Sequence, residues 1–78
     1  MMTKKKWDPK NVYIPTNWRD LYLSVEQTAV ILNESPKTMY NRNSRGDGPI
    51  FYKIGGKCKY FGRELEEWIR GNGSVTAK

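Results

Sequence analysis

The chain has 78 residues, which is enough for one domain but leaves little interior for a deeply buried active site. Hydrophobic residues make up 37% and charged residues 28% of it, a balance typical of a soluble globular domain with a thin core. No apolar stretch approaches the roughly 20 residues of a membrane span, and no apolar run follows Lys4, Lys5 and Lys6, so we expect a cytoplasmic protein without a membrane helix or signal peptide.

The reactive side chains exclude the commonest catalytic and metal sites. Cys58 is the single cysteine and there is no histidine, so the usual zinc ligand set and a Ser/His or Cys/His nucleophile pair are both missing. The carboxylates Glu64, Glu66 and Glu67 have the spacing of a solvated helix face. We therefore expect no enzyme, no metal, no cofactor and no small-molecule ligand.

The positive charge is concentrated in the middle of the chain. The formal net charge is +6, and residues 35–63 carry seven Lys/Arg against one Asp/Glu, whereas the segments before and after are nearly balanced. Such a patch can neutralise phosphates and release condensed counterions, which favours nucleic acid as the partner. An anionic membrane is disfavoured because no basic amphipathic helix is present.

Residues 1–20 show neither helical nor strand periodicity, and two prolines interrupt them. We interpret them as a partly disordered amino-terminal arm. Its aromatic residues Trp7, Tyr13 and Trp18 are candidates for packing on the domain, for contact with a neighbouring subunit or for contact with a partner protein. The lysines at 4–6 fit either phosphate contacts or a solubilising tip.

Two short helices follow. Ser24 and Gln27 form a capping-box pattern before a helix expected over Val25–Asn33, in which Val25, Ala29 and Leu32 share one apolar face. Ser35-Pro36 then predicts the start of a second helix after a gap of two or three residues, the spacing of a helix-turn-helix.

The second helix has an inner face and a polar outer face. At about 100° per residue, Pro36, Met39 and Asn43 point to one side. The outer side carries Lys37, Thr38, Asn41, Ser44 and Arg45. These residue types read base edges and contact phosphates in DNA complexes, although a merely solvated helix face has a similar composition.

A β-hairpin is predicted over Ile50–Ile54 and Lys57–Phe61 with a turn at Gly55-Gly56. The expected pairs are Ile54 with Lys57, Lys53 with Cys58, Tyr52 with Lys59 and Phe51 with Tyr60. One face then carries Phe51, Cys58 and Tyr60 toward the core, and the other carries Tyr52, Lys57 and Lys59, with Lys53 near the tip. A lysine-rich hairpin with a tight glycine turn suits a wing against the DNA backbone or minor groove.

The last helix is expected over Arg63–Arg70, where Leu65, Trp68 and Ile69 share a face, Trp68 is placed in the core and Gly71 serves as the carboxyl-terminal cap. Residues 72–78 are expected to form a flexible tail.

The segment from Tyr22 to Ile69 resembles the excisionase and AlpA-like DNA-binding proteins of phages and mobile elements, which are distantly similar to MerR regulators. The matching marks are Leu23-Ser24, Ala29, Leu32, Ser35, Thr38, Tyr40, Gly46, Gly48-Pro49, Phe51, Lys53, Ile54-Gly55, Tyr60, Leu65 and Trp68-Ile69. The resemblance implies an α+β fold of the winged helix-turn-helix type over residues 21–71.

Two positions depart from that pattern. Arg42 stands where these proteins often have an aromatic residue that seats the second helix, so we expect it to extend past the core and reach phosphate. Phe61-Gly62 replaces a more polar stretch, which removes one expected backbone contact.

The resemblance implies a sequence-specific protein that binds clustered sites on double-stranded DNA, bends it and promotes excision by a tyrosine or serine integrase in a prokaryotic cell, with self-association along the DNA. The alternatives are a small AlpA/MerR-like transcriptional regulator and a protein-interaction module whose basic patch meets an acidic partner. The candidate DNA contacts are Ser35, Lys37, Thr38, Asn41, Arg42, Ser44 and Arg45 in the helix, and Lys53, Gly55, Gly56, Lys57 and Lys59 in the wing.

Overall fold

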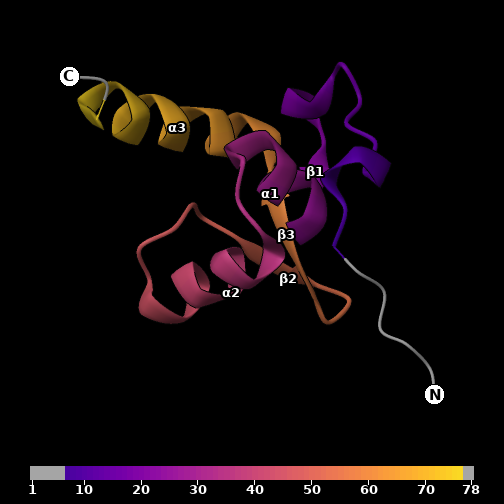
Figure 1. Cartoon of the computed structure of the whole chain (residues 1–78). Helices are drawn as coiled ribbons and strands as arrows, with labels where there is room; N and C mark the ends of the chain where they lie inside the picture. Colours follow the sequence, from indigo (N-terminus) through magenta and orange to yellow (C-terminus); the bar gives the residue numbers. More distant parts are fainter. Residues whose placement is uncertain (1–6, 77–78) are drawn as a thin grey trace.

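The computed structural model describes residues 7–76, with side chains described through Gly71. Two 3-10 turns, η1 (Pro9–Asn11) and η2 (Trp18–Asp20), precede strand β1 (Tyr22–Leu23). Helices α1 (Val25–Leu32) and α2 (Pro36–Arg45), strands β2 (Tyr52–Ile54) and β3 (Lys57–Phe61), and helix α3 (Gly62–Thr76) follow (Figure 1). Residues 1–6 and 77–78, which include the amino-terminal lysines and the end of the expected tail, lie outside the described residues.

Helix α1 begins and ends where its caps require. The Ser24 hydroxyl accepts from the Gln27 amide at 3.1 Å, and the Gln27 side chain accepts from the Ser24 amide at 2.9 Å, which confirms the capping box. After Leu32, Asn33 takes the left-handed conformation with φ of 59° and ends the helix.

The three strands form an antiparallel sheet in the order β1-β3-β2. The hairpin register is the expected one for Ile54 with Lys57, Lys53 with Cys58, and Tyr52 with Lys59. The sequence did not predict β1, whose two residues pair with Phe61 and Tyr60 of β3. A strand of two residues is too short to show an alternating pattern in the sequence. Its partner strand also lies far along the chain, so no local turn signal marks the pairing.

The core lies where α1, α2 and β3 meet. Its buried members are Leu23, Val25, Ala29, Met39, Tyr60 and Leu65, with Phe51, Cys58, Leu32 and Trp7 partly buried against it. This confirms the apolar face of α1, the inward position of Met39, and the core-facing side of the hairpin. Thr28, the one buried polar residue among those described, donates to the Ser24 carbonyl oxygen at 2.9 Å.

The described part of the amino-terminal arm packs on the domain. Trp7 packs against the core cluster, and the Gln27 side-chain amide donates to the Tyr13 carbonyl oxygen at 3.1 Å. The η2 turn lies against α3, and a Cβ added to Gly62 would fall 2.0 Å from the Trp18 carbonyl oxygen. Gly62 therefore lets the chain at the start of α3 pass close to the arm, which accounts for a glycine at this position.

Helix α3 begins at Gly62 and continues through Gly71 to Thr76, so the expected end at Gly71 was wrong. A glycine inside a helix costs only about 1 kcal/mol relative to alanine, so Gly71 alone does not end the helix. Trp68 is partly buried rather than in the fully buried core.

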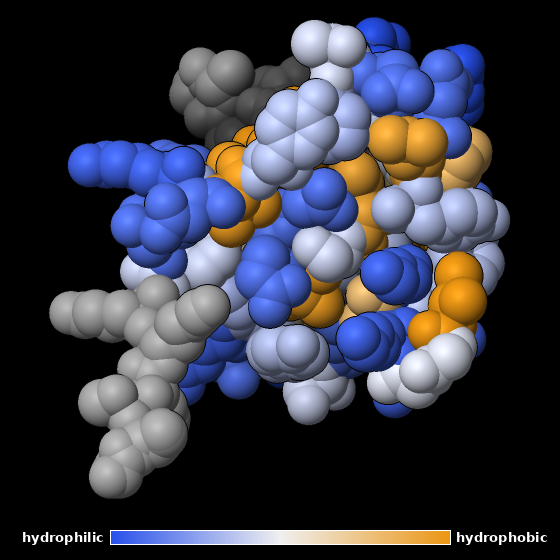
Figure 2. Space-filling view, turned by 90° about the vertical axis from the view of Figure 1, so that its right-hand side faces the viewer, coloured by the Kyte–Doolittle hydropathy of each residue, from blue (hydrophilic) through white to orange (hydrophobic). Residues whose placement is uncertain are grey.

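The face of the molecule in Figure 2 shows hydrophobic residues as small patches separated by hydrophilic side chains. Among the described helices, none combines the length and the apolar character that crossing a membrane would require.

Candidate nucleic-acid interface

Helix α2 is fixed at both ends by local hydrogen bonds. The Ser35 hydroxyl accepts from the Thr38 amide at 3.3 Å and lies 3.1 Å from the Thr38 hydroxyl, and Pro36 occupies the first turn. Gly46 closes the helix with φ of 76°. The predicted start at Ser35-Pro36 is confirmed, and both hydroxyls belong to the cap at the amino terminus of α2.

The outer face of α2 is exposed and polar. Lys37, Asn41, Ser44 and Arg45 are exposed, and Thr38 is partly buried at the cap. Tyr40 is also exposed, at 53%, although the sequence analysis did not place it among the contact residues. The helical projection contains the signal, because Tyr40 precedes Ser44 by one turn and so shares its side of the helix.

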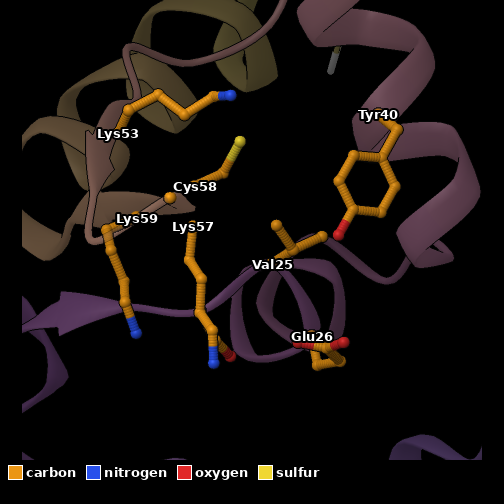
Figure 3. Close-up of a pocket in the computed structure, with 9 residues that line it drawn as sticks. Val25, Glu26, Tyr40, Lys53, Lys57, Cys58 and Lys59 are labelled. Atoms are coloured by element: carbon orange, nitrogen blue, oxygen red, sulfur yellow. The ribbon is translucent and has the colours of Figure 1, made fainter.

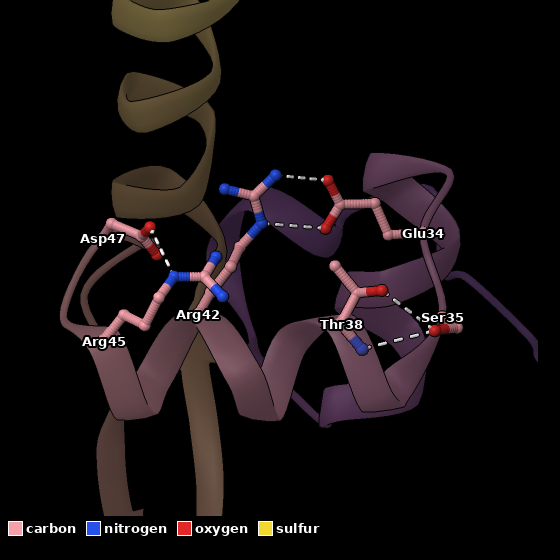
Figure 4. A network of polar contacts seen from close by, with 6 residues as sticks. All are labelled: Glu34, Ser35, Thr38, Arg42, Arg45 and Asp47. Carbon is pink, nitrogen blue, oxygen red and sulfur yellow. Dashed lines mark hydrogen bonds and ion pairs between the residues drawn. The ribbon is translucent and has the colours of Figure 1, made fainter.

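Arg42 does not reach outward. Its Nε and Nη2 atoms donate to the two carboxylate oxygens of Glu34, at 3.1 and 2.6 Å (Figure 4). The guanidinium also lies 5.5 Å from the centroid of the Trp68 ring. The hydrogen bond that Arg42 donates to Glu34 raises the pKa of Arg42, against the opposing effect of burial. Arg42 therefore links the turn before α2 to α3 and does not extend outward as expected.

Arg45 remains at the surface at the other end of α2. Its Nε atom donates to Asp47 at 3.0 Å, and more than half of each side chain is exposed. An exposed pair of this kind contributes little stability and is screened by salt, so Arg45 can exchange Asp47 for another acceptor.

The wing is built on a two-glycine turn. Gly55 and Gly56 have φ of 60° and 81°, the left-handed values at both central positions that make glycine favourable there. Lys57 is exposed and Lys59 is partly buried, and both point to the face of the hairpin opposite Cys58 (Figure 3). Lys53 pairs with Cys58 and shares its face, so the three wing lysines lie on two faces of the hairpin.

The helix and the wing are joined by a side-chain pair in the interior. The Asn43 amide donates to the Tyr60 hydroxyl at 2.8 Å, and that hydroxyl is 3.2 Å from the Asn43 carbonyl oxygen. Tyr60 is fully buried, and burial raises the pKa of its hydroxyl although the hydrogen bond with Asn43 acts in the opposite direction. Helical periodicity predicts the inner position of Asn43, but no sequence pattern identifies Tyr60 as its partner.

These elements bring the candidate contacts to one side of the molecule. In Figure 1, α2 and the tip of the β2–β3 hairpin lie on the lower side, whereas α3 lies on the upper side. Helix α2 and the wing therefore lie beside one another, and Tyr40 of α2 lines the same groove as Lys53, Lys57 and Lys59 of the wing.

The comparison with protein-family models agrees with this arrangement. A model described as a helix-turn-helix domain matches residues 22–73, which is about two thirds of the chain. Searches of curated proteins and of solved structures gave no significant match. The match begins at β1 and extends into α3, so it includes α1, α2 and the wing in a fold compatible with a winged helix-turn-helix. The chain belongs to the helix-turn-helix domain family.

Proposed function

We propose that this protein binds double-stranded DNA in a sequence-specific manner, with α2 in the major groove and the β2–β3 wing against the adjacent backbone or minor groove. The observation that carries the proposal is the joint presentation of the polar α2 face and the lysine-bearing wing on one side of the molecule. A helix fits the major groove of B-DNA, and lysines beside it neutralise phosphates.

The side chains divide into two roles. Asn41 and Arg45 are exposed on α2, and their side chains are of the types that bond an adenine edge and a guanine edge, with Lys37 and Ser44 beside them. Lys53, Lys57 and Lys59 supply sequence-independent affinity, and Gly55 and Gly56 keep the wing tip narrow enough to approach the backbone. Ser35 and Thr38 lie at the amino terminus of α2, and there we expect them to meet a phosphate through the helix end.

The role we propose is that of an excisionase, which binds clustered sites, bends the DNA and promotes excision by an integrase of the tyrosine or serine type. The support for this finer assignment is the resemblance carried by Gly48-Pro49, the Ile54-Gly55 turn and Trp68-Ile69. Modest affinity at each site would then be summed along adjacent sites by contacts between bound copies.

Footprinting and a bend assay on DNA flanking the gene, at near-physiological salt, test this role. Several adjacent protected sites and a bend beside an integrase attachment site are the expected result. A single protected operator in a promoter, without an array, would identify a transcriptional regulator instead. Absence of any duplex binding would contradict the DNA-binding proposal as a whole and direct attention to an acidic protein partner.

A further inference from the structure

A groove of about 440 Å³ separates α2 from the wing. Tyr40 of α2 lines one wall, Lys53 and Cys58 of the hairpin line the other, and Val25 at the start of α1 lines the floor (Figure 3). The Tyr40 ring and the Lys53 side chain extend toward the groove from opposite walls. The groove thus lies between the two elements that we propose as DNA contacts.

The groove carries net positive charge. Lys53, Lys57 and Lys59 line it, and Glu26 is the one carboxylate among its lining residues. The Tyr40 hydroxyl adds a neutral hydrogen-bond donor on the wall opposite Lys53. A lysine and a hydroxyl on opposite walls of a groove are suited to an anion with several acceptor oxygens, because each donor can approach a different oxygen.

We infer that this groove holds one segment of the phosphodiester backbone of bound DNA, with the Lys53 ammonium and the Tyr40 hydroxyl as donors to its phosphate oxygens. The inference rests on the proposed function: when α2 enters a major groove and the wing reaches past its edge, a DNA strand has to pass between them. The contact is sequence-independent. It fixes the register in which Asn41 meets the bases.

Paired substitutions at the two walls test the contact. Tyr40→Phe should weaken binding to specific and random duplexes by the same factor, roughly 3- to 10-fold, with little change in salt dependence. Lys53→Gln should weaken both and lower the slope of log K against log salt by about 0.9. Tyr22→Phe is the matched control, because Tyr22 is equally exposed at 53% but lies outside the groove lining. Wild-type affinity in both groove variants would overturn the inference.

Alkylation of Cys58 tests independently whether DNA occupies the groove, because Cys58 is the single cysteine and it lines the groove. We expect saturating duplex to slow alkylation of Cys58 by N-ethylmaleimide at least about tenfold, and high salt that releases the DNA to restore the rate. Variants with Tyr40→Phe or Lys53→Gln should need proportionately more DNA for the same protection.

The two levels of the proposal fail in different ways. If the chain binds no duplex in a gel shift, the proposed function is wrong and the groove loses its occupant. If it binds duplex while Cys58 is alkylated at an unchanged rate, DNA binds but the backbone does not enter the groove.

Glu26→Gln should change the affinity in the opposite direction, since removing the carboxylate should raise affinity for all duplexes about twofold or more.

Discussion

Asn43 of α2 and Tyr60 of β3 are joined through their side chains. The Tyr60 hydroxyl oxygen lies 2.8 Å from the amide nitrogen and 3.2 Å from the carbonyl oxygen of Asn43. Because one partner lies on the proposed recognition helix and the other on the wing strand, the pair fixes the spacing between the two proposed DNA-contacting elements. Tyr60 is fully buried and Asn43 is partly buried, so these hydrogen bonds are costly to lose and the spacing is held firmly.

Tyr60→Phe should therefore lower the free energy of unfolding by about 1–2 kcal/mol, because it leaves the Asn43 side chain without its main partner. Urea denaturation followed by tryptophan fluorescence measures the change. Tyr52→Phe is the control, since that hydroxyl bonds Glu64 at the surface, and its cost should stay within about 0.5 kcal/mol. Equal costs for the two variants would show that the buried pair is not a specific link.

Gly62→Ala should destabilise the fold by at least about 3 kcal/mol. The added Cβ would fall 2.0 Å from the Trp18 carbonyl oxygen and 2.6 Å from the Arg19 Cα, and backbone atoms cannot move aside cheaply.

In contrast, Gly71→Ala should raise stability by about 0.5–1 kcal/mol, because Gly71 lies inside α3 with nothing within 4 Å of its added Cβ. A destabilising Gly71→Ala would argue that the helix ends there after all. Thermal unfolding of Gly62→Ala and Gly71→Ala, each compared with the unsubstituted protein, measures both changes in stability.

Arg42→Lys should cost roughly 1 kcal/mol, although the charge is kept, because lysine cannot make the two-point contact with Glu34 or lie flat near Trp68. Arg45→Lys is the matched exposed substitution and should change stability little. The roles reverse in DNA binding, where Arg45→Lys should reduce sequence discrimination and Arg42→Lys should not. A loss of discrimination at Arg42 alone would restore it as a base contact.

Stability should fall as the pH drops below about 4.5, in part through Glu66. The hydrogen bond from Arg19, at 2.8 Å, lowers the pKa of Glu66 from its usual value of 4.5, with burial opposing and Arg70 contributing further. A lowered folded-state pKa stabilises the fold above the unfolded pKa, and that contribution is lost as the pH falls through the folded one. Unfolding measured from pH 7 to pH 3 should show a shallower decline for Glu66→Gln than for Glu67→Gln.

The local parts of this fold could be predicted because they depend on neighbouring residues. Ser24 and Gln27 predict the start of α1, and Ser35-Pro36 predicts the start of α2. The Gly55-Gly56 turn is enough to predict the register of the hairpin. The burial of Met39 and the inward position of Asn43 follow from helical periodicity alone.

The parts that could not be predicted depend on residues far apart in the chain. Strand β1 exists because β3 offers it an edge, and the role of Arg42 depends on Glu34 and Trp68, which lie on either side of it in sequence. The helical projection places Tyr40 on the same side of α2 as Ser44, but its position across the groove from the wing depends on the fold. Composition marks such residues as polar or aromatic, but the contact itself appears only in the folded chain.

The most direct test of the central claim is equilibrium binding of the whole chain to its specific duplex and to random duplex across a range of salt concentrations. Asn41→Ala should reduce discrimination between the two duplexes by roughly 1–3 kcal/mol, whereas Lys57→Gln should weaken both alike and lower the salt slope by about 0.9. Equal effects of the two substitutions on both duplexes would contradict the division between a reading helix and an anchoring wing.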